Sequence, residues 1–139
     1  MTNQAPIMFS KEIEVRWADC DANNHMRHSA YSDFCAHTRI GFLEQIGLGM
    51  DWCQNNHIGP VLFREETEYA REVHMGEVLT VTISGVAHTG FTKSVQLSQQ
   101  ILKQNGEVAA LHKCVVAWMD LEKRKIIELP EPIKKSLTQ

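Results

Sequence analysis

One segment of this chain has the spacing of a long helix, and almost everything after it has the pattern of β-strands. Between residues 30 and 46, apolar side chains recur every three or four residues, as they do on one face of an α-helix. Gly47 and Gly49 mark its expected end. Beyond about residue 58 the sequence is rich in Val, Ile and Thr and repeatedly alternates apolar with polar residues, which predicts strands.

The strands can be placed from this alternation. One precedes the helix, and four follow it and are joined by short turns, so those four are expected to be antiparallel. Asn105-Gly106 predicts a hairpin between the last two strands, because both residues accept positive φ. A short helix is expected after Pro132. The expected strands span residues 9–17, 61–69, 78–88, 92–103 and 108–121.

A single helix restricts how such a sheet can bury its apolar side chains. One helix cannot cover both faces of a five-stranded sheet. The simplest solution is an α+β fold in which a curved, mainly antiparallel sheet wraps around the helix. A second copy of the chain would then cover the remaining apolar face or edge. We therefore expect one domain over residues 1–139 that forms a homodimer or homotetramer.

The charge and the N-terminal sequence restrict the class of protein. The net charge is −3, whereas general binders of nucleic acid or anionic membranes need a basic excess. No apolar stretch is long enough to span a bilayer, and residues 1–12 do not resemble a signal peptide. The four cysteines form no CxxC pair. These features predict a cytoplasmic protein with reduced thiols that binds neither nucleic acid nor membrane.

The densest polar cluster lies between the first strand and the helix. A helix N-terminus offers unpaired N–H groups that can stabilise an oxyanion, and a nearby carboxylate can attack a carbonyl carbon or activate water. Thioesters suit such a site, because a thiolate leaves with little help from an acid. The same residue types also serve simply to turn the chain and cap the helix. The cluster comprises Asp19, Asp21, Asn23, Asn24, His25 and His28.

Two segments resemble the 4-hydroxybenzoyl-CoA thioesterase-like family of hot-dog-fold proteins. Residues 17–31 are similar to the family signature DxDxxGHVNNxxY, which an arginine follows on the helix. Residues 69–77 are similar to its YxRPxxxGD segment. The resemblance extends over nearly the whole chain. The residues in register with the first signature are Asp19, Asp21, His25, Met26, Tyr31 and Arg39.

The resemblance implies a hydrolase of acyl-CoA or acyl-carrier-protein thioesters, with its sites at a dimer interface. The catalytic carboxylate maps to Asp21, as nucleophile or general base, and His25 would orient Asp21 or the substrate, or only hydrogen-bond within the turn. No cofactor is implied beyond the CoA of the substrate. Residues expected to contact the acyl group or line its pocket are Asn24, Met26, His28 and Tyr31, and candidates for the CoA phosphates are Arg64, Arg71, Lys93 and Lys113.

The chain departs from the family pattern near this site. Asn24 replaces a glycine, and asparagine is the next most tolerant residue for positive φ. Arg27-His28 replaces a pair of asparagines, which brings a cation and an imidazole to the site. Further departures are Ala36, Glu72 and Glu77. None removes the catalytic carboxylate, but together they leave the acyl group undetermined.

Three alternatives share some features of this sequence. Asp19, Asp21, His25 and His28 are metal-ligand types, but no HExxH or paired-cysteine frame accompanies them, so no metal is expected. Residues 21–25 superficially resemble the DxNPxxH pattern of hot-dog enoyl-thioester hydratases, without its proline. A hot-dog domain can also bind acyl-CoA without catalysis, since a fold does not determine a function.

Overall fold

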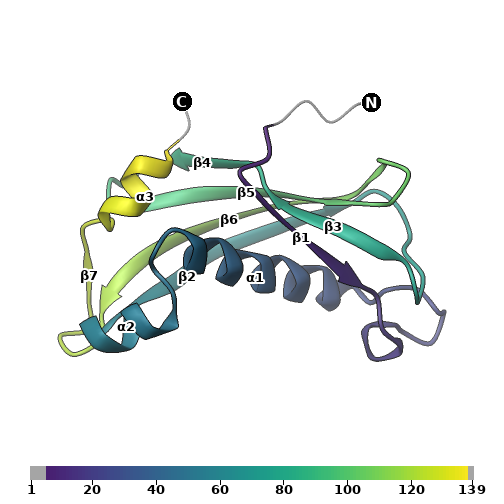
Figure 1. The fold of residues 1–139 in the computed structure, drawn as a ribbon, viewed down its shortest axis with the longest axis horizontal. Coiled ribbons are helices and arrows are strands. Elements are labelled where there is room, and N and C mark those ends of the chain that lie inside the picture. The colour runs from purple at the N-terminus through teal and green to yellow at the C-terminus, as the bar shows by residue number, and fades with distance from the viewer. Residues whose placement is uncertain (1–5, 138–139) are drawn as a thin grey trace.

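The computed structural model describes residues 6–137 and shows an antiparallel sheet curved around one long helix (Figure 1). The main path of the sheet runs β1-β3-β5-β6-β2, with β4 attached to β5 and β7 to β6. Each pairing is antiparallel. The strands are β1 (Phe9–Glu14), β2 (Ile58–Tyr69), β3 (Val78–Ile83), β4 (Gly85–His88), β5 (Ser94–Leu102), β6 (Val108–Asp120) and β7 (Lys125–Ile127).

The long helix α1 (His28–Gln45) packs on the sheet with the face that the sequence pattern predicted. A 3₁₀ turn, η1 (Trp17–Asp19), precedes it, and two short helices follow, α2 (Met50–Asn56) and α3 (Glu131–Ser136). This arrangement confirms the expected α+β hot-dog architecture. The buried side chains of α1 are Ala30, Tyr31, Phe34, Cys35, Thr38, Phe42 and Leu43.

The structure corrects several details of the prediction. The first strand ends at Glu14, and Trp17, expected on the buried side, is 80% exposed, because the chain has already turned into η1. The predicted strand over 78–88 is divided at Ser84, whose N–H bonds to the Ser98 carbonyl. Helix α2 was missed because none of its residues is buried, so it has no apolar stripe to detect.

Two positions of the fold favour glycine, one for its backbone conformation and one for a close contact. Gly106 has φ 89° in the β5–β6 turn, which confirms the predicted hairpin. Gly41, inside α1, faces the ring of Phe9: an added Cβ would lie 2.9 Å from Phe9 Cζ. The approach that this glycine permits is therefore to a β1 side chain, not to another backbone.

Strand β2 forms one edge of the sheet and leaves large apolar side chains in solvent. In residues 6–137 it pairs only with β6. Leu62 is 45% exposed and Phe63 49% exposed. The register with β6 shifts between Leu62 and Arg64, so Phe63 lies at a β-bulge, and this irregular stretch of the edge carries exposed apolar surface.

None of the helices in the described part of the chain is long and apolar enough to cross a membrane.

Candidate active site

The two segments that carry the family resemblance lie against each other at the start of α1. The N–H of Met26 donates to the Val73 carbonyl over 2.7 Å, and His25 and His74 form an antiparallel bridge. The N–H of Gly76 donates to the Val15 carbonyl and connects the second segment to the end of β1. Residues about fifty positions apart in sequence thus form one small, hydrogen-bonded unit.

Asp19 is a structural residue. It is 2% exposed, and its carboxylate accepts hydrogen bonds from the backbone N–H, Nε and Nη2 of Arg16 at 2.9–3.1 Å. The side-chain hydrogen bond from Arg16 holds the pKa of Asp19 below its ordinary value, although desolvation opposes this. The carbonyl of Asp19 accepts the N–H of Arg27 just before α1. These bonds fix the course of the loop and leave Asp19 unsuited to attack a substrate.

Asp21 is exposed, and its carboxylate is held by one oxygen only. Oδ1 accepts the N–H of Asn23 at 2.9 Å and that of His25 at 3.3 Å. Within residues 6–137, Oδ2 accepts no hydrogen bond, so it is open to a substrate or a water molecule. The donors to Asp21 belong to its own loop, which precedes α1.

The turn that holds Asp21 depends on a residue with positive φ. Asn24 has φ 64°, and its N–H donates to the Asp21 carbonyl at 3.0 Å. Asparagine, which stands where the family signature has glycine, thus adopts positive φ here, as expected from its tolerance of this region.

An open cleft of about 400 Å³ lies in front of Asp21. Tyr31 forms part of its wall: it is buried, its hydroxyl donates to the Arg71 carbonyl, and its ring meets that of Tyr69 edge-on at 5.0 Å. Desolvation raises the pKa of Tyr31, so the phenol keeps the proton that it donates to the Arg71 carbonyl. The cleft residues are Asp21, His25, Met26, His28, Tyr31, Tyr69, Ala70, Arg71 and Glu72.

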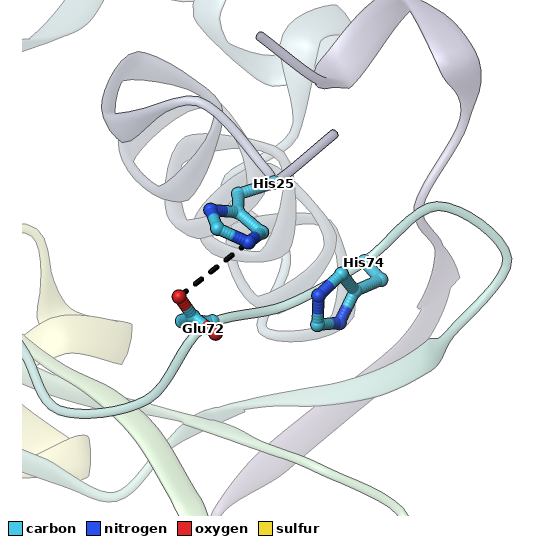
Figure 2. A group of neighbouring side chains, drawn as sticks. All are labelled: His25, Glu72 and His74. Carbon is cyan, nitrogen blue, oxygen red and sulfur yellow. Dashed lines mark ion pairs between the residues drawn. The ribbon is translucent and has the colours of Figure 1, made fainter. Parts of the chain in front are cut away.

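The structure adds two residues that the sequence did not assign to the site. Figure 2 shows His25 from the first segment beside Glu72 and His74 from the second. His25 Nε2 lies 3.4 Å from Glu72 Oε1, and the two imidazole rings lie 5.0 Å apart, edge to face. The ligand set considered from sequence combined His25 with Asp19, Asp21 and His28; the imidazole is grouped with Glu72 and His74 instead.

The basic residues considered for CoA phosphates do not all reach this cleft. Arg71 borders it, with Nε 3.6 Å from Glu107. Arg64 lies on the β2 edge and pairs with Glu66, and Lys113 is exposed on β6. Lys93 precedes β5, whereas the cleft lies at the other end of that strand, roughly 30 Å away at about 3.3 Å per residue.

Arg39, the helical arginine in register with the signature, belongs to a separate, partly buried network. Its Nη1 donates to Gln99 Oε1 at 3.0 Å and lies 3.4 Å from His112 Nε2, while His112 Nδ1 contacts Thr67 Oγ1 at 2.7 Å. Burial, reinforced by the charge of Arg39, lowers the pKa of His112 to about 4. Gln99 gave a sequence signal, since it falls on the apolar side of an alternating strand.

Comparisons with known proteins agree with this fold. The model of the thioesterase-like superfamily matches residues 15–137. Among solved structures, similar folds include Staphylococcus aureus SAV2348 in complex with CoA (22% identity, TM-score 0.82, covering 100% of this chain and 89% of that one). A 1,4-dihydroxy-2-naphthoyl-CoA thioesterase from Synechocystis is also similar (17%, 0.81, covering 93% and 94%). So is Escherichia coli YbaW (24%, 0.80, covering 94% and 99%). At these identities the structural likenesses establish the fold.

Proposed function

Because the chain belongs to the thioesterase-like superfamily, we propose that it hydrolyses acyl-CoA thioesters with Asp21 as the reacting carboxylate. The observation that carries this assignment is the unequal hydrogen bonding of the two carboxylate oxygens of Asp21. Oδ1 is fixed by two backbone N–H groups, whereas Oδ2 is unbonded within the described residues and borders the cleft. Asp19, the other acidic residue of the signature, is fully engaged with Arg16.

The chemistry needs little beyond this carboxylate and backbone donors. Asp21 either attacks the thioester carbonyl carbon or removes a proton from the water that does so. The N–H groups of His28 and Ser29, in the first turn of α1, would stabilise the oxyanion that forms, because the N-cap Arg27 provides no side-chain cap for them, whereas the Ala30 N–H already donates to the Arg27 carbonyl. The C–S bond then breaks, and the products are the carboxylic acid and the CoA thiol. His28, in that first turn, borders the same cleft.

The CoA portion would approach along the β2 end of the cleft. Arg71 is the basic residue there, and its guanidinium is more than half exposed, so it can contact a phosphate after leaving Glu107. Arg64 and Lys113 lie farther along the exposed surface of β2 and β6 and would serve only for a substrate that extends over the sheet.

A second copy of the chain is expected beside β2. This strand is a sheet edge that exposes two large apolar side chains, Leu62 and Phe63, and an exposed apolar edge can pair with another chain. Its last residue, Tyr69, also borders the cleft. A homodimer formed through β2 would therefore place the partner subunit next to Asp21.

The assignment is tested by release of CoA thiol from a panel of short, long, branched and aromatic acyl-CoAs. Asp21→Asn should lower kcat by about 100-fold or more, the scale of a lost reacting or general-base group. Asp51→Asn, on the exposed side of α2, is the matched control and should keep full activity. An Asp21→Asn protein with unchanged kcat would remove Asp21 from the mechanism.

The same panel separates the alternatives. Water addition to crotonyl-CoA without thiol release would indicate a hydratase. Tight binding of acyl-CoA without turnover of any substrate would indicate a binding protein.

A further inference from the structure

Two histidines and a glutamate at the cleft have the arrangement of a transition-metal site. One nitrogen or oxygen from each of His25, Glu72 and His74 lies within 4.8 Å of the other two. Imidazole and carboxylate are preferred ligands of Zn²⁺ and neighbouring divalent ions. We propose that this chain binds Zn²⁺, or a chemically similar divalent ion, through His25, Glu72 and His74.

The backbone places these three side chains on one surface. His25 and His74 are opposite each other in an antiparallel bridge, which the Met26–Val73 hydrogen bond reinforces. Opposite residues of such a bridge point to the same side, and so does the residue two positions away on one strand, here Glu72. Two short extended segments thus bring the three side chains together as neighbours (Figure 2).

The separations fit tetrahedral coordination with small side-chain rotations. Two ligands of a tetrahedral zinc ion, at bonds of about 2.05 Å, are about 3.4 Å apart. His25 Nε2 and Glu72 Oε1 are 3.4 Å apart. An ion between them needs the His74 nitrogen, which lies within 4.8 Å of the other two ligand atoms, to move inward by up to about 1.4 Å, and rotation of the exposed His74 side chain provides this. Water would complete the coordination.

Glu77 supplies outer support for one of the histidines. Its Oε2 accepts the backbone N–H of His74 at 2.7 Å and lies 3.4 Å from His74 Nδ1. Metal-bound histidines commonly pair their other ring nitrogen with a carboxylate, which fixes the tautomer. Glu77 has this position when Nε2 of His74 takes the ion. Lys103 balances the charge of Glu77, with Nζ 3.4 Å from Oε1.

An ion at this site would act on the cleft. His25 and Glu72 both border the cleft that contains Asp21. A bound cation would hold the His25 ring against Glu72 and place a positive charge near the Asp21 carboxylate. The expected consequence is inhibition of the proposed hydrolysis, so the site would be inhibitory and not catalytic.

Metal binding itself is the test, and it does not depend on the hydrolase activity. The metal-free full-length protein is titrated with ZnCl₂ by calorimetry, and the visible spectrum is recorded with Co²⁺, whose bands report tetrahedral imidazole ligation. We expect one saturable site per chain. His74→Ala and Glu72→Gln should each weaken binding by about tenfold or more. His88→Ala, an exposed histidine on β4, is the matched control and should bind as the native chain does.

Circular dichroism establishes whether each variant is folded. If His74→Ala does not fold, the Glu72→Gln variant is used for the binding test instead. Absence of saturable binding, or equal affinity in His74→Ala and His88→Ala, would overturn the proposal. If acyl-CoA hydrolysis is observed, Zn²⁺ should inhibit the native protein and the His88→Ala variant but not His74→Ala, and a chelator should restore activity.

Discussion

Arg16 donates three hydrogen bonds to the carboxylate of Asp19 and so removes that acid from the cleft that Asp21 borders. Asp19 and Asp21 are two residues apart in sequence, yet one is buried and paired while the other is exposed and accepts only backbone N–H groups of its own loop. This division between a structural and a reactive carboxylate leads directly to the first prediction.

Asp19→Asn should destabilise the fold, whereas Asp21→Asn should not. Asparagine loses the ionic partner of Arg16, and a buried hydrogen bond to a charged group is worth about 1.5–3 kcal/mol. At position 21, asparagine keeps an oxygen for the N–H groups of Asn23 and His25. Urea unfolding measures both variants, and equal midpoints for Asp19→Asn and the native chain would contradict the structural role of Asp19.

Stability should fall between about pH 6.5 and pH 4 because of His112. Its pKa is about 4 in the fold and near 6.5 when unfolded, so the unfolded chain binds more protons in this window. The contribution of His112 to the free energy of unfolding is fully present above pH 6.5, the pKa of the unfolded state. It is lost as the pH falls toward 4, the pKa in the fold, and it amounts to about 3 kcal/mol. Urea unfolding at several pH values measures it.

A variant without this titration isolates the effect. His112→Gln retains hydrogen-bonding capacity and should give a flatter stability profile over the same pH range. The exposed His88→Gln should leave the profile unchanged. If the native slope persists in His112→Gln, another group is responsible for it.

Asn24→Gly and Asn24→Ala should have different effects on the stability of the fold. The residue has φ 64°, a conformation that costs alanine about 1–2 kcal/mol and glycine nothing. The alanine variant should therefore be less stable than the native chain, and the glycine variant at least as stable. Thermal unfolding compares the two. Equal losses in both variants would show that the asparagine side chain, and not its backbone conformation, matters.

A charge on the β2 edge should separate the proposed dimer. Phe63→Asp places a carboxylate on the exposed edge, where pairing would bury it, so the variant should be monomeric by light scattering. Phe91→Asp is the control, because Phe91 is similarly exposed but lies in the loop before β5. A monomeric native protein, or a dimeric Phe63→Asp, would exclude this interface.

Arg71→Ala should raise KM for acyl-CoA by about tenfold with little change in kcat, because a contact to a CoA phosphate, which takes no part in the reaction, is equal in ground and transition states. Lys134→Ala, on exposed α3, should leave both constants unchanged. Steady-state kinetics measure this, and an unaltered KM in Arg71→Ala would place the CoA phosphates elsewhere.

The apolar pattern by itself determined the main architecture. The periodicity of residues 30–46 gave the buried face of α1, and alternation gave the strands with Gly106 in their hairpin. These features depend on local spacing, which is written directly in the sequence. Helix α2 lacked a buried face and strand β7 has three residues, so neither produced a pattern strong enough to detect.

The sequence, through its signature, also selected Asp21 and its loop, but only the tertiary structure decided the surroundings. Arg16 satisfies Asp19, the loop's own N–H groups hold Asp21, and Glu72 and His74 join His25 across a bridge between distant segments. Residues 25 and 74 have no sequence relationship that reveals this proximity. Their contact arises because the curved sheet returns the end of β2 to the start of α1, and burial and hydrogen bonding then fix which side chains meet.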